Sequence, residues 1–243
     1  MNIVKQIPNS ITCLNLISGV IAIIFSFNEQ FDYAVLAIIV AALFDFLDGL
    51  AARMFKAYSD MGKELDSLAD TVSFGVAPSL IGFNYLNGFP DIPTYSSYII
   101  LVMAALSAVR LAKFNLDTRQ SENFLGLPVP ANALFFSSLI TLAYHYPQVA
   151  NSIVHSGYII PLLAIFLGLL LVSEIPMFSM KLKSLKWREN RIRYTFLTII
   201  IPVSVAIYLL GIHWTGIISF IFGSYIIANI AIALFRKFSD KKI

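Results

Sequence analysis

Charged residues are scarce in this sequence. Asp, Glu, Lys and Arg make up 13% of its 243 residues, whereas about 25% is ordinary for a soluble domain. Hydrophobic residues make up 58%, and a soluble chain of this length could not bury that much apolar surface. The composition therefore excludes a soluble globular protein. It predicts an all-α, polytopic integral membrane helical bundle that forms a single domain over residues 1–243.

Cysteine is nearly absent too. The one cysteine, Cys13, excludes an intramolecular disulfide and leaves the redox compartment undetermined. The first apolar stretch follows a single lysine and lacks a small-residue cleavage site, so we expect a retained helix and no cleaved signal peptide.

Eight apolar stretches are long enough, or nearly so, to cross a hydrocarbon core that needs about 20 helical residues. We therefore expect about eight transmembrane helices. They are predicted near Pro8–Phe27, Phe31–Met54, Asp66–Tyr85, Tyr95–Asn115, Pro130–Tyr146, Tyr158–Phe178, Tyr194–Leu210 and Thr215–Phe235.

Lysine and arginine are missing from every second connecting segment. Residues 28–32, 87–97, 146–157 and 211–216 contain neither. With eight helices, all 17 Lys and Arg fall at or near one face, as the positive-inside rule requires of the cytoplasmic face. This predicts a multi-pass cell-membrane protein with both termini in the cytoplasm. The net charge of +3 then reflects topology and anionic headgroups and not nucleic-acid binding.

Against this apolar background, four aspartates recur at helical spacing near one membrane surface. A charge at the bilayer midplane costs roughly 2.5–3.5 kcal/mol, so four carboxylates require compensation. Asp45 and Asp48 share one helical stripe with Gly49, Ala52 and Arg53, because these positions are separated by three or four residues.

The next predicted helix repeats the pattern. Gly62, Asp66 and Asp70 are spaced by four residues, and Ser73 follows on the same side. A short polar turn joins the two helices. Two adjacent antiparallel helices would therefore gather four carboxylates into one cluster.

Clustered carboxylates repel one another unless protons or cations intervene. Hard divalent ions such as Mg²⁺ and Mn²⁺ prefer oxygen ligands, and two ions can share bridging carboxylates. Two bound ions would leave open positions for a phosphate substrate. Gly49, Ala52 and Gly62 leave room for a bulky ligand, and Arg53 suits a phosphate oxygen.

Two alternatives compete with a metal-dependent enzyme. Intramembrane acids can serve a proton relay or pair with basic residues. A cation- or proton-coupled transporter could also use such acids, although it would more naturally scatter them over several helices.

The ordered motif resembles the signature of the CDP-alcohol phosphotransferase family, DxxDGxxAR followed by GxxxDxxxD. Its eight fixed positions are matched by Asp45, Asp48, Gly49, Ala52, Arg53, Gly62, Asp66 and Asp70. The resemblance implies integral membrane enzymes that displace CMP from a CDP-linked lipid with an alcohol, using divalent metals. It implies that the four aspartates bind two ions, Mg²⁺ or Mn²⁺, and that Asp70 is the catalytic general base. Gly49, Ala52, Arg53 and Gly62, with Asp48, would shape the CDP-lipid site.

Further stretches resemble the phosphatidylserine synthase branch of this family. They are "IPNSITCLNLISGV", "LADTVSFGVAPS", "RLAKFN" and "GLPVPANA", all within about the first 135 residues. The branch implies transfer from CDP-diacylglycerol, or an ether-lipid analogue, to L-serine. It also implies a homodimer, and nucleotide contacts from Asn9 and Thr12, which could equally cap the first helix. Glycerol 3-phosphate, inositol phosphate or another alcohol remains an alternative acceptor.

Serine needs a cation for its carboxylate close to the metal site. Arg110 lies within an apolar stretch, which is costly unless it faces a cavity, and Lys113 follows three residues later. We expect both to bind the serine carboxylate and Asn132 to supply amide groups. Alternatively, Arg110 pairs with a helix carboxylate and Lys113 reaches the interface. Arg191, in the basic segment 181–193, either completes the site or only contacts anionic lipid.

Overall fold

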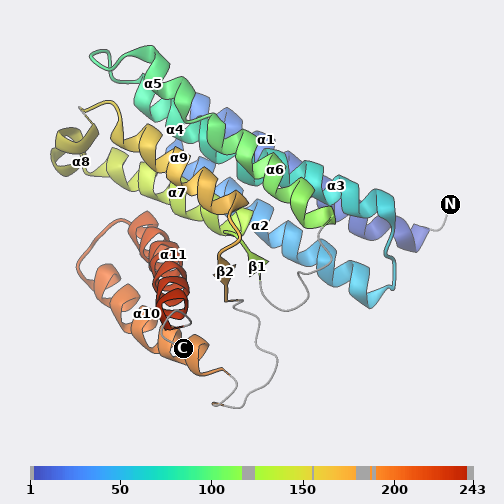
Figure 1. Ribbon diagram of the computed structural model, residues 1–243. Coiled ribbons are helices and arrows are strands. Elements are labelled where there is room, and N and C mark those ends of the chain that lie inside the picture. Colours follow the sequence, from blue (N-terminus) through green and yellow to red (C-terminus); the bar gives the residue numbers. More distant parts are fainter. Residues whose placement is uncertain (1–2, 117–123, 155, 179–186, 188–189, 240–243) are drawn as a thin grey trace.

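The computed structural model describes residues 3–116, 124–154, 156–178, 187 and 190–239. Its elements run along one long bundle, with a helical hairpin packed at one side (Figure 1). The helices are α1 (Ile3–Phe27), α2 (Phe31–Met54), α3 (Asp60–Asp70), α4 (Ala77–Asn87), α5 (Thr94–Ile99), α6 (Val102–Leu116), α7 (Val129–His145), α8 (Pro147–Val154), α9 (Ile159–Val172), α10 (Arg191–Leu209) and α11 (Trp214–Ser239). A π-helix, η1 (Thr71–Val76), joins α3 to α4, and β1 (Phe124–Leu125) pairs with β2 (Pro176–Met177).

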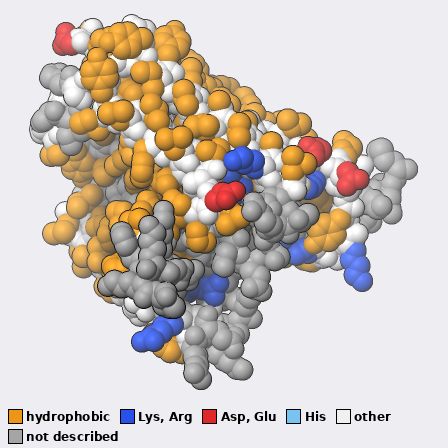
Figure 2. All heavy atoms as spheres, viewed as in Figure 1, with side chains coloured by type: hydrophobic (Ala, Val, Ile, Leu, Met, Phe, Trp, Pro, Cys, Tyr) orange, Lys and Arg blue, Asp and Glu red, His pale blue; other side chains and the backbone are white. Residues whose placement is uncertain are grey.

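Four segments of these helices are long and apolar enough to cross a membrane. They are Gln6–Phe27, Phe31–Met54, Thr94–Leu116 and Trp214–Phe235. Large apolar side chains remain exposed along them, for example Ile17 and Ile24 on α1 and Leu43 and Phe46 on α2. Hydrophobic side chains dominate the face seen in Figure 2, as expected for a surface that lipid tails would cover. The predicted all-α membrane bundle is confirmed.

Each of the eight predicted apolar stretches contains helix in the structure. The number of membrane crossings and the side on which the termini lie stay predictions. The stretch Tyr158–Phe178 ends early as a helix, because the chain becomes extended at Ser173 (ψ 160°) after α9 ends. Pro176 lacks the N–H that a continuing helix would need. β2, which pairs antiparallel with β1 and which the sequence did not suggest, lies beyond this point.

Helices α1 and α2 form an antiparallel hairpin and pack against each other. On its other side α1 approaches η1 very closely at Gly19. A Cβ added to Gly19 would lie 2.3 Å from Ser73 Oγ and 2.6 Å from Ser73 Cα. Only glycine leaves room for this approach, which brings α1 against the helix that carries two of the aspartates.

The buried core lies where α2, η1, α4 and α7 meet. Ile38, Phe74, Ile81 and Phe136 are fully buried members of it. Helix α11 packs along α7, and Ser138 Oγ lies 2.9 Å from Ser219 Oγ between them. Helix α10 packs mainly on α11, so the hairpin is held to the bundle largely through α11.

Candidate active site

The C-terminal half of α2 carries the first two aspartates. Asp48 is 6% exposed, and the Thr12 hydroxyl of α1 donates a hydrogen bond of 2.6 Å to Asp48 Oδ2. Asp45 lies one turn earlier and faces the same cavity. Gly49 has no side chain, and Arg53 lies close to it: a Cβ on Gly49 would be 3.6 Å from an Arg53 guanidinium nitrogen. The Arg53 side chain thus folds back over Gly49.

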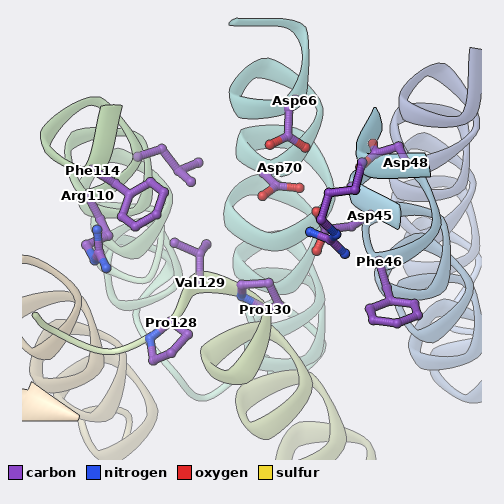
Figure 3. Close-up of a pocket in the computed structure, with 13 residues that line it drawn as sticks. Asp45, Phe46, Asp48, Asp66, Asp70, Arg110, Phe114, Pro128, Val129 and Pro130 are labelled. Atoms are coloured by element: carbon purple, nitrogen blue, oxygen red, sulfur yellow. The ribbon is translucent and has the colours of Figure 1, made fainter. Parts of the chain in front are cut away.

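Helix α3 presents the other two aspartates. It begins after Ser59, whose side chain accepts a hydrogen bond of 3.0 Å from the Gly62 N–H and so caps the helix. Asp66 and Asp70 follow on the face turned toward α2 (Figure 3). Asp70 is the last residue before η1, and short π-helical segments occur frequently at functional sites.

Asp70 is buried, and its Oδ1 accepts a hydrogen bond of 3.0 Å from the Asn15 side-chain amide of α1. The Ser73 hydroxyl in turn donates to the Asn15 backbone carbonyl, at 2.9 Å. Two helices are therefore fixed to each other directly beneath the aspartate cluster. The close approach at Gly19 is what makes these contacts possible.

The aspartates are arranged as metal ligands would be. One carboxylate oxygen from each of Asp45, Asp48 and Asp66 lies within 4.8 Å of the other two. Asp66 Oδ1 is buried and has no hydrogen-bond partner among the described residues. A buried carboxylate oxygen without a donor is costly, and a hard divalent cation would satisfy it. The residues present therefore fit the divalent metal that the motif predicts.

A cavity of about 380 Å³ opens beside the cluster (Figure 3). The four aspartates line one wall, and Arg110 of α6 stands on the opposite wall. Its remaining lining is formed by Phe46, Gly49, Arg53, Leu111, Phe114, Pro128, Val129 and Pro130. The Arg110 guanidinium lies 5.2 Å from the centre of the Phe114 ring. This cavity thus has a cation on the wall opposite the carboxylates.

A second cavity, of about 210 Å³, adjoins two of these aspartates, Asp48 and Asp66. Asp48, Gly49 and Asp66 line both cavities. The predicted CDP-lipid residues Asn9, Thr12, Ala52 and Gly62 line the smaller one, together with Pro8, Ala57, Tyr58, Ser59 and Lys63. A Cβ on Gly62 would lie 3.1 Å from Asn9 Oδ1, so this glycine brings α3 close to α1.

The four residues predicted to bind serine lie in different environments in the structure. Arg110 lines the larger cavity, whereas Lys113 is exposed and its Nζ lies 3.4 Å from the Val172 carbonyl at the end of α9. Asn132 is fully buried, and both polar atoms of its side chain lack a hydrogen-bond partner among the described residues. Arg191 is the exposed first residue of α10. Of these four, Arg110 alone is among the described residues that line either cavity.

Two further residues contact the site or its aspartates and were not predicted from the sequence. Asn15 holds Asp70, and Lys63 lines the smaller cavity while its Nζ donates to the Asn115 carbonyl at 2.7 Å. The sequence could have indicated a role for Asn15, because a polar amide within an apolar helix needs a hydrogen-bond partner. It lies one turn after Thr12, on the stripe that leads to Gly19.

Carboxylates on two neighbouring helices, beside two cavities in a membrane bundle, form the kind of site that the motif predicts. The chain belongs to the CDP-alcohol phosphatidyltransferase family, whose model matches residues 5–185. The predicted family is thereby confirmed.

Relatives of known name sharpen this assignment. The chain is 35% identical over 187 residues to the CDP-diacylglycerol–serine O-phosphatidyltransferase of Helicobacter pylori strain J99, covering 74% of each protein. It is 36% identical over 149 residues to the Bacillus subtilis protein of that name, covering 61% of this chain and 81% of the relative. The protein of that name from Methanocaldococcus jannaschii is 38% identical over 169 residues, covering 70% of this chain and 72% of the relative.

Proposed function

We propose that this protein transfers the phosphatidyl group, or its ether-lipid equivalent, of a CDP-lipid to the hydroxyl of L-serine and releases CMP. The observation that carries the proposal is the position of the aspartate cluster between two cavities. One cavity holds the residues expected to bind the nucleotide, and the other holds a buried arginine. The names of the relatives support serine as the acceptor.

The CDP headgroup is proposed to lie across the cluster, with its cytidine side in the smaller cavity. Asn9 and Thr12 would contact the nucleotide there, and Gly49, Ala52 and Gly62 leave the space it needs. Arg53 lines the larger cavity next to Asp45 and Asp48. Its planar guanidinium suits a diphosphate oxygen because it can donate two parallel hydrogen bonds.

Serine is proposed to bind in the larger cavity, with its carboxylate on Arg110. This arginine is 4% exposed, and a buried cation facing a cavity is a strong anchor for a small anion. Lys113, Asn132 and Arg191 remain predicted serine contacts. The buried amide of Asn132, which lacks partners among the described residues, is the best supported of these three.

Asp45, Asp48, Asp66 and Asp70 are proposed to hold two divalent ions, Mg²⁺ or Mn²⁺. Bound there, such ions would supply charge stabilisation for the diphosphate and for the leaving CMP. The chain contributes the geometry of the ligands. Thr12 fixes Asp48, and Asn15 fixes one oxygen of Asp70.

The remaining oxygen of Asp70 is proposed to take the proton of the serine hydroxyl. The hydroxyl oxygen then forms a bond to the lipid-side phosphorus as the bond from that phosphorus to CMP breaks. Direct displacement predicts inversion at phosphorus. A covalent lipid–enzyme intermediate would require a nucleophile, and the motif offers none beyond the four carboxylates.

The decisive experiment incubates the purified full chain with a CDP-lipid and Mg²⁺ or Mn²⁺ and measures CMP release while the acceptor is varied. Release that depends on serine and is absent with glycerol 3-phosphate or inositol phosphate is the expected result. Release with a different acceptor would keep the aspartate chemistry and overturn the serine assignment. Ion flux without CMP release would favour a transporter.

The serine pocket is tested by a matched pair of variants. Arg110→Gln should raise the KM for serine at least tenfold and leave the KM for the CDP-lipid nearly unchanged, because it removes the cation that faces the acceptor side. Lys56→Gln removes an exposed cation that lines neither cavity and should change the serine KM less than threefold. Equal effects of the two variants would contradict the assignment of Arg110.

We further propose a homodimer in the cell membrane, with the active site facing the cytoplasm. Arg53 at the end of α2, Lys56 in the connection to α3 and Lys63 in the first part of α3 lie close in the chain to the four aspartates. Some lysine and arginine side chains are visible in Figure 2. This distribution follows the positive-inside rule. Labelling of single cysteines in the 28–30 and 55–59 connections in intact cells would determine the orientation, and cross-linking in membranes would test the dimer.

A further inference from the structure

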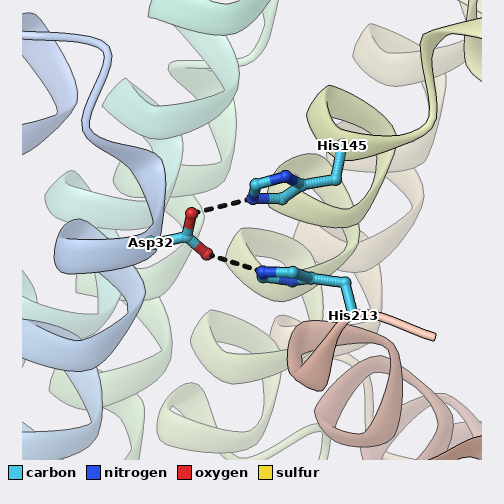
Figure 4. A group of neighbouring side chains, drawn as sticks. All are labelled: Asp32, His145 and His213. Carbon is cyan, nitrogen blue, oxygen red and sulfur yellow. Dashed lines mark hydrogen bonds and ion pairs between the residues drawn. The ribbon is translucent and has the colours of Figure 1, made fainter. Parts of the chain in front are cut away.

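A second group of ligating side chains lies at the other end of α2. Asp32 in its first turn, His145 at the end of α7 and His213 in the turn before α11 converge there (Figure 4). Asp32 Oδ2 lies 2.7 Å from His145 Nε2, and Asp32 Oδ1 lies 3.4 Å from His213 Nε2. Asp32 and Asp48 are about 24 Å apart along the helix at ~1.5 Å per residue. The group is therefore separate from the active site.

Its donor atoms are those that transition metals prefer. Two imidazole nitrogens and a carboxylate oxygen form a ligand set typical of zinc and related divalent ions. The three ligand atoms lie within 4.8 Å of one another, and two ligands of a tetrahedral zinc ion lie roughly 3.4 Å apart for bonds of ~2.0–2.1 Å. Small side-chain rotations would bring all three onto one ion.

The two rings are already aligned for this. His145 and His213 stack with their centres 3.8 Å apart and an angle of 22° between their planes. Both turn Nε2 toward the same carboxylate. Asp32 Oδ1 is buried and accepts no hydrogen bond within the described part of the chain. This oxygen thus has a long contact of 3.4 Å with His213 Nε2 and no hydrogen bond to a described residue.

The surroundings of His213 hold it in the orientation of a metal ligand. Its Nδ1 lies 2.9 Å from the hydroxyl of the buried Thr215, and its backbone N–H donates to the Tyr146 hydroxyl at 3.0 Å. The Thr215 backbone N–H also donates to Nδ1, at 3.5 Å. Metal binding at Nε2 would place the ring proton on Nδ1, where the Thr215 hydroxyl can accept it. Ligating histidines usually hold their second nitrogen in this way.

We propose that Asp32, His145 and His213 bind one zinc-class divalent ion. The ion clamps the start of α2, the end of α7 and the turn between α10 and α11. It ties the α10–α11 hairpin, which otherwise packs on the bundle largely through α11 and α7, to the first hairpin of the fold. A water molecule would complete the coordination on the exposed side of His145. This site goes beyond the proposed transferase activity and does not depend on it.

The test uses the purified full chain, stripped with chelator and kept in excess Mg²⁺ so that the aspartate cluster is occupied. Zn²⁺ is titrated while bound metal and the thermal midpoint are measured. One equivalent should bind and raise the midpoint. His145→Gln, His213→Gln and Asp32→Asn should each weaken that binding at least tenfold, and Thr215→Val about tenfold.

Asp91→Asn is the control, because Asp91 is an exposed loop carboxylate that belongs to neither group of ligating side chains. It should bind Zn²⁺ as the wild type does. Equal Zn²⁺ binding by all variants, or none by the wild type, would overturn the proposal. Mg²⁺-dependent CMP release reports whether each variant is folded.

X-ray absorption of the Zn²⁺-loaded wild type keeps the proposal testable if the variants do not fold. Two imidazole ligands per zinc are expected. A shell of oxygen atoms without imidazole scattering would assign the metal to the aspartates and refute this site.

Discussion

The carboxylates at the two ends of α2 have different polar partners. Asp32, at one end, faces two imidazoles that come from distant helices. Asp48, near the other end, accepts a hydrogen bond from the Thr12 hydroxyl, and Asp70 beside it accepts one from the Asn15 amide. Neutral donors orient a carboxylate without neutralising it. An imidazole that takes up a proton becomes a cation and can neutralise the carboxylate.

This difference in donors separates two kinds of cation site on one helix. An all-oxygen cluster suits hard ions such as Mg²⁺ and Mn²⁺, whereas nitrogen ligands favour zinc and its neighbours. The oxygen cluster also adjoins two cavities, and the histidine group ties three helical segments together. Chemistry and assembly are therefore assigned to opposite ends of the bundle.

Among changes at the end of the bundle that carries the aspartate cluster (the oxygen end), Asp70→Asn should be the most damaging. It keeps the size of the side chain and removes the proposed base, so CMP release should fall by about 10³-fold or more, near the upper range for general-base catalysis. Binding of the CDP-lipid should be partly retained, as measured by competition with a labelled nucleotide. Asp91→Asn, at an exposed loop position, is the control and should be fully active. Full activity of Asp70→Asn would refute its role as base.

Asn15→Ala tests whether the neutral donor orients Asp70. The variant should lower activity about tenfold and raise the Mn²⁺ concentration needed for half-maximal activity by roughly ten- to a hundredfold, as for other groups that orient metal ligands.

Asn84→Ala is the matched control for Asn15. It removes another amide hydrogen bond between the same hairpin and α4, from Asn84 Nδ2 to Ser26 Oγ at 2.7 Å. It should leave the Mn²⁺ dependence unchanged. The same shift in both variants would mean that Asn15 acts through stability alone.

Gly19→Ala tests the close approach that supports the oxygen end. The new Cβ would clash with Ser73 backbone and side-chain atoms, and overpacking of this kind costs about 1–3 kcal/mol. We expect a lower thermal midpoint and, because Asn15 and Asp70 move apart, lower activity even below that midpoint. Gly88→Ala, where the nearest atom is 3.3 Å from the added Cβ, should have little effect on either measurement.

The smallest effect is expected from a change of pH on the stability of the end of the bundle that carries His145 and His213 (the histidine end). His213 lies just outside the candidate span Trp214–Phe235, and burial and His145 lower its pKa despite the opposing effect of Asp32. The fold then binds fewer protons than the unfolded chain, so this contribution to stability is present above the unfolded pKa of ~6.5 and is lost as pH falls below that value and through the lower folded pKa.

In chelator-treated protein, the thermal midpoint should therefore fall between pH 7.5 and pH 5.5 more in the wild type than in His213→Gln. The difference should correspond to less than about 1 kcal/mol, because the group is partly solvated. Identical pH profiles for the two proteins would contradict this assignment.

Much of the molecule followed from the sequence alone. Scarce charge and long apolar runs determined a helical membrane protein, since the backbone must satisfy its own hydrogen bonds in lipid. The spacing of Asp45, Asp48, Asp66 and Asp70 determined that four carboxylates face one another, because both helices repeat every 3.6 residues. These are local or periodic properties, and a linear pattern is enough to predict them.

The tertiary structure decided which residues from distant segments join these patterns. Arg110 and Lys113 are one turn apart, yet only the first lines the cavity, because rotation about the helix axis is set by packing against neighbouring helices. Asn15 reached Asp70 because Gly19 lets α1 approach η1. His145 and His213, which the sequence left without a role, meet Asp32 only where three segments far apart in the chain converge. Such contacts depend on how helices pack, and no local spacing records that.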